Sequence, residues 1–92
     1  MIRSIRHKGL LRFFSNGDKR GINAVHGQRI ERLLDRLEVA SCPEDMNLPG
    51  FKFHGLVGFN PTRYAVTVSG NWRITFAFDG EDAVDVDLED YH

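Results

Sequence analysis

The sequence is poor in the features that cross-link a protein or carry it to a membrane. Cys42 is the only cysteine, so no internal disulfide can form and no cysteine-based zinc site is expected. The opening MIRSIRHKGLL scatters basic residues among apolar ones, and it resembles neither an export signal nor a membrane span. The sequence therefore predicts a cytoplasmic protein without a membrane partner.

Basic residues are absent after Arg73 and scarce throughout the second half of the chain. Residues 1–40 carry nine Lys or Arg against four Asp or Glu, whereas residues 41–92 carry three against nine. The net charge of −1 by itself argues weakly against a nucleic-acid-binding protein. The asymmetry indicates a basic surface held apart from an acidic one, although two ordinary solvated faces would give the same counts.

Helices are predicted in the first half of the chain. Residues 1–5 alternate partly and are a candidate edge strand. Apolar residues then recur at helical spacing up to Asn16-Gly17, which favours a stop. A second helix, with Asn23 as its candidate N-cap, carries an apolar stripe at i, i+3, i+4 and i+7. The two apolar sets are Leu10, Leu11, Phe13 and Phe14, and Ile30, Leu33, Leu34 and Leu37.

From Phe51 onward the apolar period changes to two, which is typical of strands. Ser69-Gly70-Asn71 and Asp79-Gly80 supply turn residues between the runs. We expect a single domain over residues 1–92, of the α+β class, with two N-terminal helices packed on an antiparallel sheet. The alternating sets are Phe51 and Phe53; Tyr64, Val66 and Val68; Trp72, Ile74, Phe76 and Phe78; and Val84, Val86 and Leu88.

The apolar sets also predict which residues pair across the sheet, because a slip of one residue would turn a whole apolar face into water. The predicted apolar pairs are Val68 with Trp72, Val66 with Ile74, Phe76 with Val86, and Ile74 with Leu88. On the opposite, polar face Arg73 then lies between Thr67 and Glu89. Tyr91 lies beside Asn71. The same face carries Arg63, Ser69 and Thr75.

Arg73, Tyr91 and His92 are thereby predicted at one end of the polar face. Arginine presents a planar fork of donors suited to phosphate, and histidine titrates near neutral pH. Together these side chains favour a site for phosphoryl chemistry. The alternative is structural: Arg73 and Glu89 form a solvated cross-strand ion pair, and Tyr91 covers the edge of the sheet.

The run SGNWRITF over residues 69–76 and the segment EDYH over residues 89–92 resemble the HigB-type plasmid-maintenance killer proteins of the RelE/ParE toxin superfamily. The opening MIRS, the segment HKGL at residues 7–10 and FHGL at residues 53–56 are similar to that family as well. The likeness covers essentially the whole chain in the right order. It implies two N-terminal helices against a curved antiparallel sheet, and a toxin of a type II toxin–antitoxin system.

The resemblance implies an endoribonuclease that cuts mRNA in the ribosomal A site with neither metal nor cofactor. The ribose 2′-hydroxyl attacks the adjacent phosphate and the 5′-oxygen leaves, which requires a base, an acid and a cation. Carried over to this sequence, His92 and Tyr91 serve the acid–base steps, and Arg73 stabilises the charge of the transition state. Asn71 and Trp72 are interpreted as turn and packing residues.

Two positions depart from the family pattern. Val57 stands where many relatives have a lysine, and Ser69 stands where some have an arginine or another polar residue. Phosphate binding therefore falls to Arg73, with Arg63 and Lys52 as further candidates. Because of these two departures, one alternative interpretation is a catalytically weak toxin that acts mainly as the partner of its antitoxin. A ParE-like inhibitor of DNA gyrase, without enzymatic activity, is a second alternative.

By resemblance the partners are a HigA-like helix-turn-helix antitoxin, the ribosome and mRNA, with operator DNA bound only through the antitoxin. The acidic stretch 79–90 either takes part in partner binding or is a solvated edge. His7, His26 and His54 are interpreted as structural or exposed. Basic residues before residue 40 are either contacts to ribosomal RNA phosphates or a solvated surface. These candidates are Lys8, Arg12, Lys19, Arg20, Arg29, Arg32 and Arg36.

Overall fold

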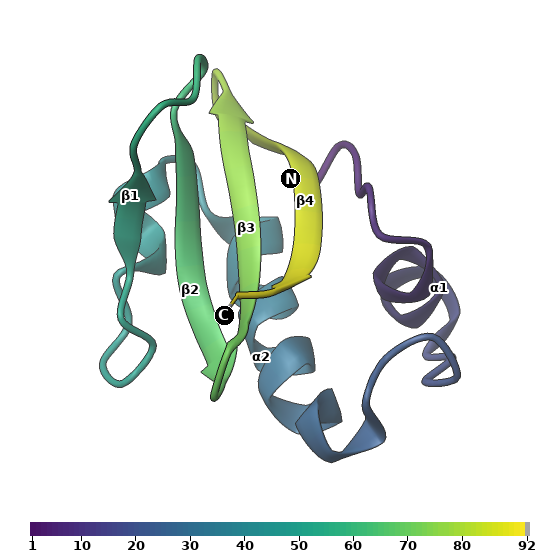
Figure 1. Cartoon of the computed structure of the whole chain (residues 1–92). Coiled ribbons are helices and arrows are strands. Elements are labelled where there is room, and N and C mark those ends of the chain that lie inside the picture. The colour runs from purple at the N-terminus through teal and green to yellow at the C-terminus, as the bar shows by residue number, and fades with distance from the viewer. Residues whose placement is uncertain (92) are drawn as a thin grey trace.

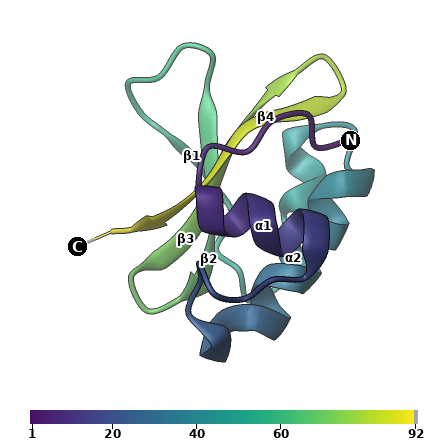
Figure 2. The same ribbon diagram turned by 90° about the vertical axis from the view of Figure 1, so that its right-hand side faces the viewer.

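The computed structural model describes residues 1–91, so His92 lies outside the described residues. A helical layer covers one face of a four-stranded antiparallel sheet with the strand order β1-β2-β3-β4 (Figure 1; Figure 2 from the side). The predicted α+β class is confirmed. The elements are α1 (Lys8–Asn16), η1 (Ala24–His26), α2 (Gly27–Val39), η2 (Pro43–Met46), β1 (His54–Leu56), β2 (Arg63–Ser69), β3 (Trp72–Asp79) and β4 (Asp82–Asp90). No helix in the described part is both long and apolar enough to cross a membrane.

Local capping determines where the helices begin and end. The His7 imidazole caps α1, because its Nδ1 accepts a hydrogen bond from the Leu10 N–H at 3.0 Å. Gly17 ends α1 in the left-handed conformation with φ at 72°. The Asn23 side chain accepts from the Val25 N–H and so caps the 3₁₀ turn η1, which leads into α2. Asn23 is thus a cap as predicted, but of the turn that precedes the helix.

The core lies between the two layers. Most of the predicted apolar residues of both helices are buried there against the inner face of the sheet, whereas Leu11 stays exposed. Each buried Leu, Ile or Phe side chain contributes about 1.5–3 kcal/mol, which holds the helices on the sheet. The buried helical side chains are Leu10, Phe13, Ile30, Leu33, Leu34 and Leu37, and the sheet contributes Val66, Val68, Ile74, Phe76, Val86 and Leu88.

The central register of the sheet agrees with the prediction. Ile74 pairs with Val66 on one side and with Leu88 on the other. On the polar face Arg73 lies between Thr67 and Glu89, as expected. The predicted pairing is therefore confirmed in the middle of β3, where burial of one face prevents a slip of the register.

The predicted register is wrong at the Trp72 end of β3, and the predicted alternation of β4 fails beyond Phe76, because each neighbouring strand contains a bulge there. Trp72 pairs with Ser69 and not with Val68. In β4 the register shifts opposite Phe76, and Asp85 has a positive φ of 52°. Asp85 and Val86 thus share the place opposite Phe76 that Val86 was predicted to hold. Beyond this bulge the faces exchange, so that Ala83 enters the core and Val84 does not.

The two edges of the sheet also differ from the expectation. The strand predicted to start at Phe51 starts only at His54. The candidate edge strand at the beginning of the chain lies parallel to β4 through two isolated bridges, Ile2 with Ala83 and Ile5 with Val86. Part of the acidic stretch faces this N-terminal segment, and its ion pairs join Arg3 to Asp79 and Asp82, and Arg6 to Asp85. These acidic residues are therefore engaged within the chain.

Candidate functional site

Arg73 and Tyr91 meet on the polar face of the sheet. The Tyr91 N–H donates to the Asn71 carbonyl at 2.7 Å, which continues the line of β4 beyond Asp90 and confirms the predicted neighbourhood of Tyr91 and Asn71. The guanidinium carbon of Arg73 lies 4.0 Å from the centroid of the Tyr91 ring. This stack holds the guanidinium in a plane without consuming its hydrogen-bond donors. Figure 2 shows that this end of β4 leads away from the helical layer.

The guanidinium of Arg73 retains bonding capacity. Its Nε is buried and has no hydrogen-bond partner among the described residues. Glu89, the cross-strand neighbour of Arg73, accepts a hydrogen bond from the Thr75 hydroxyl. The structural alternative, a solvated Arg73–Glu89 ion pair, is therefore not what the described residues form. The Nε itself is inaccessible, so an oxyanion would be bound by the terminal nitrogens of the half-buried Arg73 guanidinium.

A hollow of about 120 Å³ opens beside this stack, and it brings in a residue that the sequence analysis did not select. His54 of β1 reaches the same hollow as Arg73 and Tyr91, although it was interpreted only as structural or exposed. Pairing of His54 with Ala65 of β2 places it on the same sheet. The hollow is lined by His54, Thr67, Gly70, Asn71, Trp72, Arg73 and Tyr91.

The backbone orients the His54 ring. Nδ1 of His54 lies 2.8 Å from the Lys52 carbonyl oxygen, and a carbonyl can only accept a hydrogen bond. Nδ1 therefore carries the proton, and in the neutral ring Nε2 keeps a free lone pair. Lys52 presents this carbonyl from a left-handed conformation with φ at 53°. The segment FHGL marked this histidine in the sequence, but only strand pairing shows that it reaches the site.

Arg63 lies on the polar face as predicted, yet it is nearly enclosed. Only 6% of its surface is exposed, and its Nη2 donates to the Thr75 hydroxyl at 2.9 Å and to the Asp85 carbonyl at 2.8 Å. Burial, and secondly the charge of Arg6, lowers the pKa of the Arg63 guanidinium. These contacts make Arg63 a brace between β2, β3 and β4, which speaks against the direct phosphate contact predicted for it.

Lys52 and the two positions that depart from the family pattern, Val57 and Ser69, are exposed and do not line the hollow. Lys52 is exposed in the loop before β1, and its phosphate-binding role stays a prediction. Val57 is 98% exposed just after β1, and Ser69 is exposed at the bulge that ends β2. Tyr91 is 63% exposed and open to a ligand. His92 lies outside the described residues, and its acid–base role stays a prediction.

The basic candidates of the helical half are all exposed. Arg20 forms a fork-like ion pair with Asp18, whereas Arg29 and Arg32 both lie over the Phe51 ring. Lys8, Arg12, Arg29, Arg32 and Arg36 belong to α1 and α2, and Lys19 and Arg20 to the connection between them. They therefore form a basic surface on the helical layer, separate from the hollow on the sheet.

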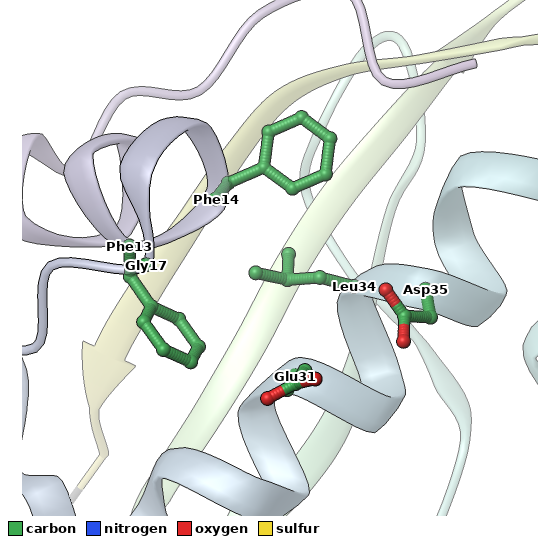
Figure 3. Close-up of a pocket in the computed structure, with 6 residues that line it drawn as sticks. All are labelled: Phe13, Phe14, Gly17, Glu31, Leu34 and Asp35. Carbon is green, nitrogen blue, oxygen red and sulfur yellow. The ribbon is translucent and has the colours of Figure 1, made fainter.

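A recess between α1 and α2 has a different character (Figure 3). Phe14, Leu34 and the carboxylates of Glu31 and Asp35 face it, and the described residues that line it include no basic side chain. A phosphate would be repelled there by the carboxylates. The sheet hollow is consequently the better candidate for phosphoryl chemistry.

Comparison with known sequences assigns the chain to a family. The profile of a family described as the RelE-like toxin of the type II toxin–antitoxin system HigB matches residues 3–92. The chain belongs to this HigB-like toxin family. Endoribonuclease HigB of Proteus vulgaris is 38% identical over 92 residues, covering 100% of both chains. The predicted family is thus confirmed, and as a type II toxin this HigB-like protein has an antitoxin as its partner.

Proposed function

We propose that this HigB-like toxin is an endoribonuclease that cleaves mRNA in the A site of the ribosome. Two findings support the proposal. Arg73, whose guanidinium is stacked on Tyr91, lies in one hollow with His54. The relative that matches over its whole length is named an endoribonuclease. The Arg73–Tyr91 stack is the observation that carries the proposal, because a cation held on an aromatic ring suits the charge that develops on phosphorus oxygens.

The reaction is an intramolecular phosphoryl transfer within the RNA. The 2′-oxygen forms a bond to phosphorus, the bond from phosphorus to the 5′-oxygen breaks, and a 2′,3′-cyclic phosphate and a 5′-hydroxyl result. His54 is our choice for the base, because its Nε2 carries the free lone pair in the neutral ring. Tyr91 and His92 supply the proton to the leaving 5′-oxygen, and Arg73 neutralises the transition state. The groups of the chain suffice for this reaction without a cofactor.

The partners follow from the family and from the charge distribution. We assign the antitoxin to the HigA-like helix-turn-helix class, with operator DNA bound only through it. The basic surface of α1, α2 and their connection contacts ribosomal RNA, because its side chains are exposed and carry positive charge that attracts phosphates. With these partners, we propose that the protein acts in the cytoplasm.

A cleavage assay on ribosomes programmed with mRNA tests the proposal. Arg73→Ala is expected to lower the cleavage rate about 10²- to 10³-fold, the usual cost of losing one donor to a transition-state oxyanion. His54→Gln, Tyr91→Phe and His92→Gln are each expected to lower it about 10²- to 10⁴-fold, as general acid–base groups do. Glu44→Gln, at an exposed position in η2, is the matched control and should cleave like the wild type.

The alternatives give distinct results in the same experiment. Intact mRNA together with inhibition of supercoiling by DNA gyrase would establish the ParE-like function in place of the nuclease. Intact mRNA together with tight antitoxin binding would identify a toxin that acts mainly as a binding partner. Cleavage that survives in the Arg73 and His54 variants would show that the hollow is not the active site.

A further inference from the structure

A second hollow lies on the polar face at the other end of the sheet. Its volume is about 100 Å³, and Arg63 and Ala77, which pair with each other in β2 and β3, form its floor. Thr67, at the catalytic hollow, is four residues further along β2, which corresponds to about 13 Å. The lining residues are Arg6, Phe59, Asn60, Pro61, Arg63, Ala77 and Asp85.

The two hollows face the same side of the molecule. Arg63 reaches Thr75, and Thr75 reaches Glu89, so these polar side chains connect one end of the face to the other. In Figure 1 the connection between β1 and β2, which carries Phe59, lies beside one end of β2 and β3, and the end of β4 lies at the opposite end. A strand of RNA held at Arg73 can therefore extend along the sheet to the second hollow.

An exposed aromatic ring forms one wall of this hollow. Phe59 is 52% exposed in the connection between β1 and β2, although burial of a Phe side chain is worth about 1.5–3 kcal/mol. Asn60 and Pro61 follow it directly along the wall. A ring that stays half in water next to polar groups is suited to stack a nucleobase, because every base has an apolar face.

Two guanidinium groups supply positive charge at the same place. Arg6 comes from the N-terminal segment, and its Nη2 lies 3.5 Å from Asp85 Oδ2 with about half of the side chain exposed. Arg63 forms the floor and bonds the Asp85 backbone carbonyl, not its carboxylate. The Asp85 carboxylate thus lies near both arginines, and the charges of Glu89 and Asp87 also act on Arg63. The exposed Arg6 can turn toward an incoming anion more readily than the buried Arg63.

We propose that this hollow binds a nucleotide of the RNA substrate a few positions away from the scissile phosphate, with the base on Phe59 and its phosphate at Arg6. The proposal rests on the proposed ribonuclease function, since it assigns a second contact to the same substrate. An aromatic ring stacks on every base. The subsite therefore raises the affinity for RNA and aligns it, whereas the hollow beside Arg73 and Tyr91 determines any sequence preference.

Binding of a short single-stranded RNA with 2′-O-methyl riboses tests the subsite without cleavage. Anisotropy of the fluorescently labelled RNA is measured for the full chain and for Phe59→Ala, Phe59→Trp and Arg6→Gln. Phe59→Ala is expected to bind about 5- to 150-fold more weakly, the range of base–aromatic stacking, and Phe59→Trp to bind as well as the wild type. Arg6→Gln should lower the slope of log affinity against log salt by about 0.7, the value of one phosphate contact in a single strand.

Val57→Ser is the matched control, because Val57 is 98% exposed in the same connection and does not line the hollow. Circular dichroism and thermal unfolding verify that each variant is folded. If Phe59→Ala binds the RNA as tightly as the wild type, the subsite is refuted, even where the wild type cleaves mRNA normally. If Phe59→Ala loses only antitoxin binding, the hollow is a protein contact and the proposal is likewise refuted.

The ribonuclease proposal and the subsite proposal can each be refuted without refuting the other. A wild type that leaves mRNA intact on the ribosome but binds the methylated RNA through Phe59 would overturn the nuclease and support the subsite. In the opposite case, cleavage that depends on Arg73 and is indifferent to Phe59→Ala at limiting protein concentration would support the nuclease and overturn the subsite.

Discussion

Thr75 links two charged side chains on the polar face although its own side chain is small. It is fully buried, its hydroxyl accepts from Arg63 at 2.9 Å, and the same hydroxyl donates to Glu89. Glu89 is in turn the cross-strand neighbour of Arg73. Glu89 forms no ion pair with Arg73 among the described residues, and the guanidinium of Arg73 stacks on Tyr91. The Thr75 hydroxyl lies between Arg63 and Glu89 on the same face.

Thr75→Val tests this role, because valine has the same shape without the hydroxyl. The change leaves a donor of Arg63 and an oxygen of Glu89 without their partner in a buried place. The free energy of unfolding is expected to fall by about 1–3 kcal/mol, measured by urea denaturation. Thr62→Val, at an exposed position, is the control and should change stability by less than about 0.5 kcal/mol. Equal stability of both variants would contradict the network.

At the scale of elements, α1 depends on a close approach of two backbones. Gly9 at the start of α1 lies against Gly21 in the connection to η1, and a Cβ on Gly9 would come within 2.0 Å of the Gly21 carbonyl oxygen. The neighbour is backbone and cannot turn aside. Only glycine at both positions lets the connection pass over the helix this closely.

Gly9→Ala should therefore destabilise the protein by at least about 1–3 kcal/mol, although alanine favours helix by about 1 kcal/mol over glycine. Gly27→Ala in α2 provides the comparison. Its Cβ would meet only the flexible side chain of Lys19, at 3.5 Å, so its stability should be equal or slightly higher. Thermal unfolding distinguishes the two. A Gly9→Ala protein as stable as Gly27→Ala would show that the connection moves freely away from α1.

The same connection contains an ion pair that makes stability depend on pH. Hydrogen bonds from the side chain and the backbone N–H of Arg20 lower the pKa of Asp18 from 3.8 to about 2. Because the pKa is lower in the folded state, this contribution to stability is complete above pH 3.8 and is lost as the pH falls through 2.

Asp18→Asn should therefore be less stable than the wild type near neutral pH, and the difference should shrink between pH 3.8 and about 2. The measurement is the free energy of unfolding of both proteins across this range. A difference that is independent of pH would mean that Asp18 contributes through its shape and not through its charge.

At the scale of the whole molecule, the basic candidates of the helical half and the acidic residues 79–90 lie in different layers, although Glu31 and Asp35 of α2 share the helical layer. The exposed basic side chains of α1, α2 and their connection remain on the helical layer. The acids of the hairpin between β3 and β4 instead bind the N-terminal segment, where the Arg3–Asp79 ion pair is 2.6 Å long. Although the net charge is −1, the basic surface on the helical layer attracts polyanions at distances of about 8–10 Å in physiological salt.

Arg32→Gln combined with Arg36→Gln should weaken sedimentation of the toxin with ribosomes. The slope of log affinity against log salt should fall by about 0.7–0.9 for each phosphate contact that is lost. The cleavage rate of ribosome-bound toxin should not change, because both residues lie outside the hollow. Asp35→Asn on the same helix serves as the control and should not lower the slope. An unchanged slope in the double variant would identify these arginines as an ordinary solvated face.

The sequence by itself determined the two helices, the α+β class and the face on which Arg73 lies. Apolar residues that recur every 3.6 or every two positions can be recognised within a short segment, and burial of the apolar face maintains that pattern in the fold. The position of Arg73 between Thr67 and Glu89 followed from the alternation of apolar and polar residues alone. Tertiary structure decided the rest. The bulges at Asp85 and after Thr67 each insert a residue into one strand, which the alternation of apolar residues does not record. Strand pairing brings His54 to the hollow of Arg73 and Tyr91, and neighbours distant in sequence enclose Arg63, whose phosphate-binding role stays a prediction.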